Sequence, residues 1–443
     1  MIAGLKPYAE YKDSGLPWLG QVPAHWRTVR NGSLFGQRSQ TGFAELPILE
    51  VSLKTGVQVR AFGNSKRKQI MSDLAKYKRA VQGDLAYNTM RMWQGALGVC
   101  PVDGLVSPAY VVARPYPGVE PLYFAALFRT GDYMAEIDNA SRGIVKDRNR
   151  LYWDQFKQMQ SPFPPRDEQA AIMRFLDWAN GRLERAIRAK RKVIALLIEQ
   201  KQAIVRRAVT RGFDATVLLK PSMIPWLGQI PQQWEIRRLK HLAHLQSGSG
   251  ITSLQIEPSG PFPVFGGNGL RGFSTRFTHK GHYVLIGRQG ALCGNINFAV
   301  GKFFASEHAV VADLQSGMSV LWFGELLRVM NLNQYSQSAA QPGLAVERIN
   351  NLYAPVPPLG EQQEIVERLQ HATLPLNAAI SRFNREIDLL REYRTRLVAD
   401  VVTGKLDVRE AAARLPDEAG PDIEAEPIEE FDDPEFTDEV AES

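Results

Sequence analysis

The chain carries PPRDEQ at residues 164–169 and PPLGEQ at residues 357–362, and each motif opens a long stretch with one shared pattern. The two stretches are offset by 193 residues, and each ends at a Val-Thr pair. In both, apolar residues recur at alternating steps of three and four, which is the seam spacing of a coiled coil. Both copies also contain one extra step of four at the same place, through Lys190 and Phe383. We therefore expect a tandem repeat with two long helices that pack on apolar seams.

Each helical stretch is interrupted at a corresponding point, by Asn180-Gly181 in the first copy and by Pro375 in the second. Glycine and especially proline destabilise a helix interior. We expect each stretch to form a short helix, a kink and a long helix of about 28 residues, which spans roughly 40 Å. The first long helix, residues 182–211, contains ten Lys or Arg residues against two Glu. This basic face either meets DNA or an acidic partner subunit, or is simply solvated.

A second repeat lies nearer the start of each half, as LPWLGQVPAHW at residues 16–26 and IPWLGQIPQQW at residues 224–234. Proline cannot donate a backbone hydrogen bond, and the shared glycine permits a turn. The motif therefore predicts a rigid loop whose tryptophans anchor it on a core. Stacking of these tryptophans on a ligand is the alternative.

Between these repeats the chain contains short apolar runs broken by Gly and Pro, which predict strands with a helix among them. Residue identity between the halves is weak here, although QGAL occurs at 94–97 and again at 289–292. We expect a mixed α/β fold in which two related globular units have diverged to do different jobs. The expected segments are globular units 1–160 and 216–355, helical repeats 161–215 and 356–408, and an acidic tail 409–443.

Composition limits the classes of protein that the chain can represent. The 443 residues are 44% hydrophobic, enough for two or three cores, and no apolar run reaches the roughly 20 residues of a membrane helix. The N-terminus lacks a signal-peptide core, so the cytosol is the expected compartment. Cys100 and Cys293 lie in different halves, which favours buried free thiols over a disulfide or a metal site.

The net charge of +6 hides an asymmetry between the body of the chain and its end. Residues 415–443 contain thirteen acidic residues and no basic one, which leaves +19 on residues 1–414. A strongly basic body suits a polyanion such as DNA, although charge alone fits a merely soluble surface equally well. The tail is too acidic and too poor in apolar residues to bury a core, so we expect disorder. A DNA-mimicking or self-inhibiting role for the tail is the alternative.

Motifs that carry catalysis or bind cofactors are missing from the sequence. It has no GxxxxGK[ST] loop, no dinucleotide fingerprint, no Asn-Pro-Pro-aromatic motif and no nuclease-type carboxylate pair followed by Glu-x-Lys. The glycine-rich FGGNG at 265–269 predicts a tight turn rather than a phosphate site. His241 and His244 have no third ligand nearby in the sequence, so we expect no metal site.

The doubled arrangement of a PWLGxxPxxW loop, a variable α/β unit and PPxxEQ before a long helix resembles the specificity (S) subunit of type I restriction-modification enzymes. The resemblance covers about residues 8–406, and the acidic tail departs from the family's usual pattern. It implies two target recognition domains that each read one half of a bipartite, here asymmetric, double-stranded DNA target. It also implies that the two long helices pack antiparallel, in a pseudo-twofold tandem repeat, as a spacer of fixed length.

The same resemblance implies a chain without catalytic residues, cofactors or metal of its own. Two methyltransferase (M) subunits would dock on the helical repeats and use S-adenosylmethionine, and a restriction and motor (R) subunit would use ATP and Mg. The function implied is host defence and DNA methylation, with DNA recognition supplied by this chain. Two rival interpretations stay open: a free-standing DNA-binding regulator or scaffold without methyltransferase partners, and an enzyme with an unrecognised catalytic motif.

Candidate DNA-contacting residues are polar or basic and are expected in loops of both globular units. Arg can pair bidentately with guanine and Gln with adenine, whereas Lys and the remaining Arg more often touch phosphate. Simple solvation of each side chain is the alternative. The candidates are Arg91, Trp93, Gln94, Arg142, Lys146, Arg148 and Arg150 in the first unit and Arg271, Arg276, Arg288 and Gln289 in the second.

Overall fold

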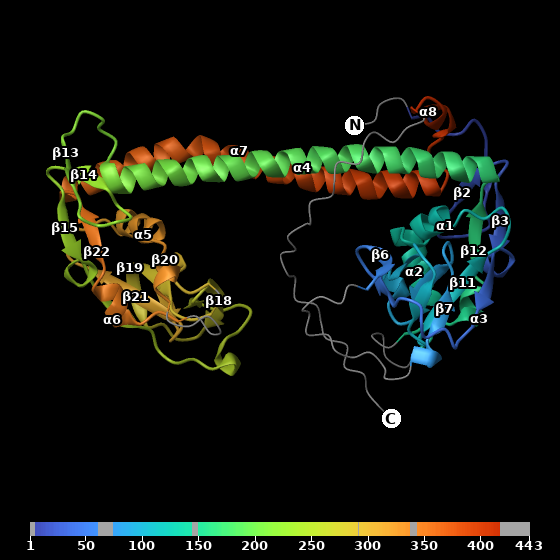
Figure 1. The fold of residues 1–443 in the computed structure, drawn as a ribbon, viewed down its shortest axis with the longest axis horizontal. Coiled ribbons are helices and arrows are strands. Elements are labelled where there is room, and N and C mark those ends of the chain that lie inside the picture. The colour runs from blue at the N-terminus through green and yellow to red at the C-terminus, as the bar shows by residue number, and fades with distance from the viewer. Residues whose placement is uncertain (1–4, 61–73, 144–148, 291, 337–342, 417–443) are drawn as a thin grey trace. The chain divides into compact units, whose positions relative to one another are not determined.

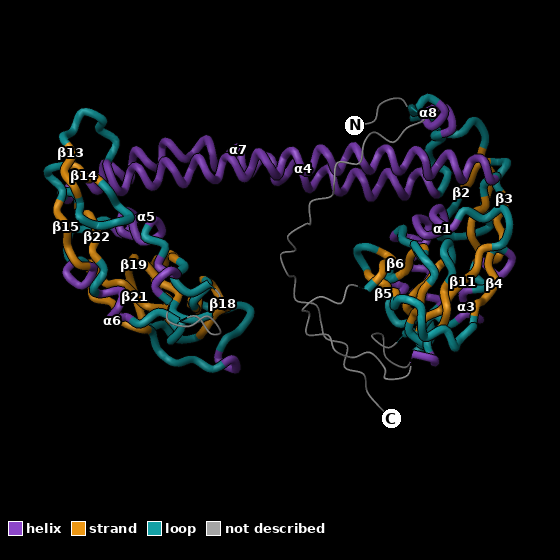
Figure 2. Tube along the Cα trace, in the orientation of Figure 1, coloured by secondary structure: helices purple, strands orange, loops and turns teal. Residues whose placement is uncertain are grey.

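A computed structural model describes residues 5–60, 74–143, 149–290, 292–336 and 343–416 (Figures 1 and 2). The chain divides into two compact units. Unit 1 comprises residues 1–188 with 387–443, and unit 2 comprises residues 189–386. Each unit therefore contains one globular part, the start of one long helix and the end of the other. Two of the candidate DNA-contacting residues, Lys146 and Arg148, lie outside the described residues.

The two long helices are α4 (Arg166–Arg211) and α7 (Leu359–Val402), and both run without a break (Figure 1). The predicted interruptions at Gly181 and Pro375 are therefore wrong. Glycine costs a helix about 1 kcal/mol and proline about 3 kcal/mol relative to alanine. The buried faces offset this cost, since Ala179 lies in the core of unit 1 and Thr373 is buried in unit 2.

Within each unit the start of one long helix packs on the end of the other, and the two run antiparallel. In unit 1, Ile172 of α4 shares a core with Val401 of α7. Glu184 of α4 accepts from Arg394 of α7 at 3.4 Å. In unit 2, Lys190 on the expected seam donates to Glu386 at 2.5 Å, and this hydrogen bond, together with the lysine charge, lowers the pKa of that carboxyl. These ion pairs are partly exposed, so they fix register more than they add stability.

The globular part of unit 1 is built on a four-stranded antiparallel sheet in the order β4-β11-β8-β9. The apolar runs predicted as strands and as a helix are confirmed, because they form β5, β8, β11 and α1. The main elements are β4 (Phe35–Arg38), β8 (Leu85–Asn88), β9 (Leu97–Val99), β11 (Tyr110–Pro115), α1 (Pro121–Phe128), α2 (Gly131–Ala140) and α3 (Trp153–Phe156). Smaller pairs are β1 (Tyr11–Asp13) with β2 (Gln21–Pro23), β3 (Arg27–Arg30) with β12 (Gln160–Phe163), β5 (Leu49–Ser52) with β6 (Gly56–Val59), and β7 (Lys78–Ala80) with β10 (Gly104–Val106).

Unit 2 has a larger, six-stranded sheet in the order β16-β21-β19-β20-β17-β18. Its strands are β16 (Ala243–Ser247), β17 (Phe262–Gly266), β18 (Gly269–Ser274), β19 (His279–Gly287), β20 (Ile296–Ala305) and β21 (Ala309–Leu314). The remaining elements are α5 (Val320–Val329), α6 (Val346–Asn350), and the pairs β13 (Leu219–Pro221) with β14 (Gln229–Pro231) and β15 (Glu235–Arg238) with β22 (Tyr353–Val356). The turn predicted at FGGNG is confirmed, because it joins β17 to β18.

A short helix, α8 (Arg409–Ala413), occupies the start of the segment expected to be disordered. The prediction of disorder is therefore wrong for these five residues. Val408 and Ala412 are buried in the core of unit 1, and a few apolar residues suffice when a core already exists to receive them. Burial opposes ionisation of Asp407, but hydrogen bonds and charge from Arg409 prevail and lower its pKa. Residues 417–443 of the acidic tail lie outside the described part of the chain.

In the described part of the chain, we find no helix that combines the length and the apolar character needed to span a bilayer.

Candidate nucleic-acid interface

The Glu of the first PPxxEQ motif fixes the repeated tryptophan loop to the start of α4 within unit 1. Glu168 is 5% exposed and accepts from the Tyr8 hydroxyl at 2.6 Å and from Trp26 Nε1 at 2.9 Å. His25 Nε2 lies 2.7 Å from its other oxygen. Burial first, and then Glu168, raises the pKa of Tyr8 far above its ordinary value. The buried carboxylate is thus fully hydrogen-bonded, as burial of a charge requires.

Unit 2 repeats this anchor with fewer partners. Trp234 Nε1 donates to Glu361 at 3.0 Å, and both Trp26 and Trp234 are fully buried in the cores of their units. The predicted anchoring role of these two tryptophans is confirmed. Trp18 and Trp226 are partly buried against the same two cores.

The Gln of each motif connects a long helix to the N-terminus of the helix in the globular part. Gln169 accepts from the backbone N–H of Glu120 at 2.9 Å, and Glu120 caps α1. Gln362 accepts from the backbone N–H of Ser319 at 3.1 Å, and Ser319 caps α5. Each amide also donates to a proline carbonyl of its own motif. The motif is therefore a joint that sets each globular part on its helices.

In unit 2 several connecting loops meet around Arg288 and Gln289, which follow β19. The Arg288 N–H donates to the His308 carbonyl at 2.8 Å, and the Gln289 side chain lies 2.9 Å from His308 Nδ1. A Cβ on Gly267, in the β17–β18 turn, would lie 3.2 Å from the carbonyl oxygens of both Gln289 and His308. The turn therefore approaches this loop closely, backbone to backbone.

Two asparagines add amide groups to the same loop cluster. Asn295 Nδ2 donates to Asn268 Oδ1 at 3.0 Å, and the N–H of Gly287 donates to the Asn295 carbonyl at 2.8 Å. The expected loop position is wrong for Arg271, which lies within β18 because the hairpin continues past the turn at 266–269. It packs across that hairpin, since a Cβ on Gly266 would lie 2.4 Å from its Cδ. Sequence reasoning missed His308, Asn268 and Asn295. Amides directly after a glycine, as in GGN and CGN, are the signal that could have found the asparagines.

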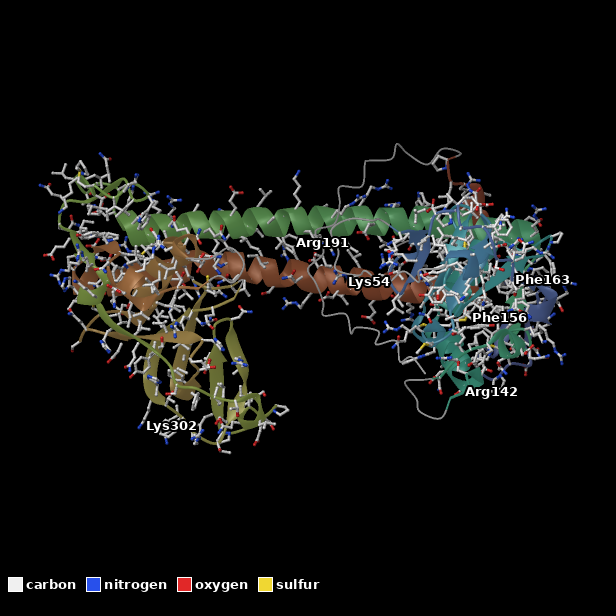
Figure 3. The ribbon with its side chains drawn as sticks, turned by 60° about the horizontal axis from the view of Figure 1, so that its bottom comes forward. Lys54, Arg142, Phe156, Phe163, Arg191 and Lys302 are labelled. Atoms are coloured by element: carbon white, nitrogen blue, oxygen red, sulfur yellow. The ribbon has the colours of Figure 1, made fainter. Side chains whose placement is uncertain are left out.

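In unit 1 the structure brings the loop after β8 beside the base of the 142–150 loop. The N–H of Leu151 donates to the Thr89 carbonyl at 2.9 Å. Arg142 and Arg150 exchange backbone hydrogen bonds of 3.0 Å in both directions, so their side chains start from adjacent backbone. Figure 3 shows Arg142 at the side of unit 1 away from α4 and α7.

The remaining candidates differ in how much of the side chain faces solvent. Gln94 is exposed, whereas Trp93 is partly buried on the core of unit 1 and donates to the Met90 carbonyl at 3.0 Å. Arg276 is exposed in the connection from β18 to β19. This connection precedes β19, whereas Gln289 follows it. Lys302 of β20 lies far from α7 in Figure 3 and sits over the Phe277 ring at 4.9 Å.

Several of the candidate arginines have no acidic partner among the residues that the structure describes. These are Arg142, Arg150, Arg271, Arg276 and Arg288. Guanidinium groups without an acidic partner are available for guanine edges or phosphate oxygens. Arg142 with Arg150 in unit 1 and Arg288 with Gln289 in unit 2, here called the two loop clusters, can therefore donate hydrogen bonds to acceptors outside the chain.

Within the described ranges, no group of three or more His, Cys, Asp or Glu residues is arranged to hold a metal ion. His241 ends a 3₁₀ turn at 239–241, and His244 lies in β16.

Comparison with known proteins gives a family match in the second half of the chain. Residues 231–387 match the family model described as the type I restriction modification DNA specificity domain. The chain is 42% identical over 130 residues to the EcoprrI specificity subunit of Escherichia coli, which covers 28% of this chain and 32% of that protein. The match thus spans about a third of that relative's length.

Longer matches are more distant. A putative type I restriction enzyme specificity subunit, MjaX, of Methanocaldococcus jannaschii is 20% identical over 425 residues, covering 88% of this chain and 96% of that protein. A chain from a structure described as the basis of complex assembly and conformational transition of the type I R-M system matches with a TM-score of 0.61 and 17% identity. That match covers 87% of this chain and 99% of the other, and it shows a shared fold.

These findings define a class of chain with mixed α/β units, two long helices and a match to a DNA specificity domain in the second half. In family match, relatives and fold, the chain resembles the specificity subunits of type I restriction-modification systems.

Proposed function

We propose that the chain is the sequence-specific DNA-binding subunit of a type I restriction-modification complex and carries no catalytic site of its own. The observation that supports this best is the contrast between the two units. Both use the same Glu–Trp and Gln–N-cap anchors, but their sheets and loops differ. A shared frame with different loops suits two recognition surfaces of different specificity, so the double-stranded DNA target would be bipartite and asymmetric.

The partners follow from this proposal. Two methyltransferase subunits would bind the helical repeats and supply S-adenosylmethionine chemistry. Through them a restriction and motor subunit would add ATP- and Mg-dependent cleavage, in the cytosol. The exposed face of the helices contributes Arg185, Arg188 and Arg191 to such an assembly, and Figure 3 shows Arg191 projecting from α4.

A methylation assay tests the proposal and its rivals together. The purified chain is incubated with S-adenosylmethionine and DNA, with and without a candidate methyltransferase subunit. Methylation only with the partner is the expected result. Methylation by the chain alone would favour an enzyme, and binding without any methylation in either arm would favour a free-standing regulator or scaffold.

We further propose that the loop clusters named above contact the DNA, one for each half of the target. Replacing Arg288 and Gln289 together by Ala should weaken binding to one half-site by roughly 1–3 kcal/mol for each base that these side chains read. The matched change of Arg142 and Arg150 to Ala should act on the other half-site. An equal loss on scrambled DNA would reassign these residues to phosphate contacts.

A further inference from the structure

The exposed side chain of Gln289 is held by a histidine rather than left free. His308 Nδ1 lies 2.9 Å from Gln289 Oε1. A free glutamine amide offers an acceptor and a donor side by side, which is the pattern that reads adenine. An amide whose oxygen is already engaged offers its NH2 group instead.

His308 is itself fixed from the other side of its ring. Its Nε2 lies 3.2 Å from Glu307 Oε1, and the second oxygen of Glu307 accepts from the backbone N–H of Ile251 at 3.2 Å. The backbone carbonyl of His308 accepts from Arg288. The imidazole therefore has a defined place between a carboxylate and an amide.

The nature of the neighbour gives the direction of the hydrogen bond at Nδ1. The atom that faces Nδ1 is the acceptor oxygen of Gln289, so this contact is a hydrogen bond in the ring tautomer that carries hydrogen on Nδ1. In that tautomer the ring donates to Gln289, and Glu307 lies beside the other ring nitrogen. The amide oxygen of Gln289 is turned toward the protein, and its NH2 group is left for another acceptor.

We propose that Glu307 and His308 are positioning residues that convert Gln289 into a hydrogen-bond donor for one base pair of the half-site read by unit 2. This inference rests on the proposed function. A donor in the major groove pairs with guanine O6 or N7, thymine O4 or adenine N7, and it finds no acceptor on cytosine. The Gln289 amide would thus discriminate against cytosine at this position of the half-site rather than select adenine.

Gln94 of unit 1 is the matched control for Gln289 of unit 2. Gln94 occurs in the same QGAL sequence and is exposed, but its side chain has no hydrogen-bond partner in the part of the chain that the structure describes. The same residue type is therefore held in one unit and free in the other. We expect Gln94 to behave as an ordinary glutamine at the other half-site.

The test uses the full chain co-expressed with its methyltransferase partner and DNA duplexes with all four base pairs at each position of the mapped target. The wild-type complex should disfavour cytosine at one position by on the order of tenfold. Gln289→Ala should abolish this preference at that position, and Gln94→Ala should leave it intact. Gln315→Ala, an exposed glutamine beyond the other end of β21, is the neutral control.

Variants of His308 test whether this residue orients the Gln289 amide or only supports the fold. His308→Ala releases the amide, and the preference at that position should shift toward adenine. His308→Asn keeps an N–H donor close to the place of Nδ1 and should retain the wild-type order. A circular dichroism spectrum and a thermal unfolding midpoint equal to those of the wild-type chain would show that each variant is folded.

Two results would overturn the inference. The first is a His308→Ala variant with the wild-type base order, and the second is an equal loss of affinity on every duplex for Gln289→Ala. A wild-type complex without preference for any half-site would overturn the proposed function and this inference together. A preference that persists but does not depend on His308 would overturn the inference alone.

Discussion

Removing the carboxylate of Glu168 should destabilise unit 1 selectively. Replacement by Ala leaves the buried Trp26 N–H and Tyr8 hydroxyl without their acceptor. Each buried donor left unsatisfied costs about 1–3 kcal/mol, so the expected loss is about 2–6 kcal/mol. His25 adds little, because its side chain is 40% exposed and water can replace the carboxylate.

The corresponding substitution in unit 2, at Glu361, should have a smaller effect on stability. Glu361→Ala removes one described acceptor, that of Trp234, and should cost about 1–3 kcal/mol. Asp167→Ala is a matched surface control, since Asp167 is exposed in the first turn of α4. Its expected effect lies within about 0.5 kcal/mol.

Two buried cysteines allow each unit to be followed separately. Cys100 in unit 1 and Cys293 in unit 2 are each 1% exposed free thiols. Burial, reinforced by Asp84, raises the pKa of Cys100 to about 12, so alkylation at pH 8 reports opening of unit 1. Mass spectrometry after pulsed alkylation across a urea series gives one midpoint for each cysteine.

The expected result for Glu168→Ala is a lower midpoint for Cys100 with that of Cys293 unchanged. With a urea m-value of about 2–3 kcal/mol per M, a loss of about 4 kcal/mol moves the midpoint by roughly 1.3–2 M. The reasoning fails if the Cys100 midpoint stays at the wild-type value, or if both midpoints fall equally.

Three further predictions concern the joint, the helices and the tail. Gln169→Ala should destabilise unit 1 and Gln362→Ala unit 2, by about 0.5–1.5 kcal/mol each, because each substitution removes the acceptor of a partly buried N–H at a helix cap. The Cys100 midpoint should fall in the first variant and the Cys293 midpoint in the second, and equal effects on both cysteines would contradict this. Inserting four residues between Lys190 and Leu197, with a matching insertion in α7, should lengthen the helices by about 6 Å. The DNA between the two half-sites, seen when methylated sites are mapped, should then grow by nearly two base pairs. An unchanged distance between the half-sites would refute the role of the helices as a spacer of fixed length. Deleting residues 417–443 removes thirteen negative charges, so DNA affinity and its salt dependence should rise, and unaltered binding would exclude a self-inhibiting tail.

Periodicity and repeats predicted most of the architecture. The three-four spacing after each PPxxEQ motif indicated α4 and α7, and the short apolar runs indicated strands such as β8 and β11. These patterns are local, because burial of one face imposes a period on the sequence of each element. Local signals also predicted the turn between β17 and β18.

Helix continuity and the extent of the tail were not predictable in the same way. Gly181 and Pro375 carry a local cost that the sequence shows, whereas the core that Ala179 joins includes Leu397 and Val401 of the opposite helix. The burial of Val408 and Ala412 likewise depends on a core built by distant segments.

The candidate site likewise has features that local sequence predicts and features that only the folded chain shows. Glycine-flanked polar residues such as Gln94 and Gln289 could be singled out from the sequence, although Gln94 ends a 3₁₀ turn at Met92–Gln94 rather than lying in a loop. Their hydrogen-bond state could not, because the partner of Gln289 is His308, which the chain brings alongside only when β19, β20 and β21 form one sheet.

The sequence alone determined that the chain is a tandem repeat with two long helices, two divergent α/β units and a strongly basic body. Those features follow from residue type and spacing along one segment at a time. Only the tertiary structure decided that Glu168 and Gln169 form a joint, and that Gln289 meets an imidazole. Hydrogen bonds between residues far apart in the chain have no period and no spacing rule, so they can be observed only once the chain has folded.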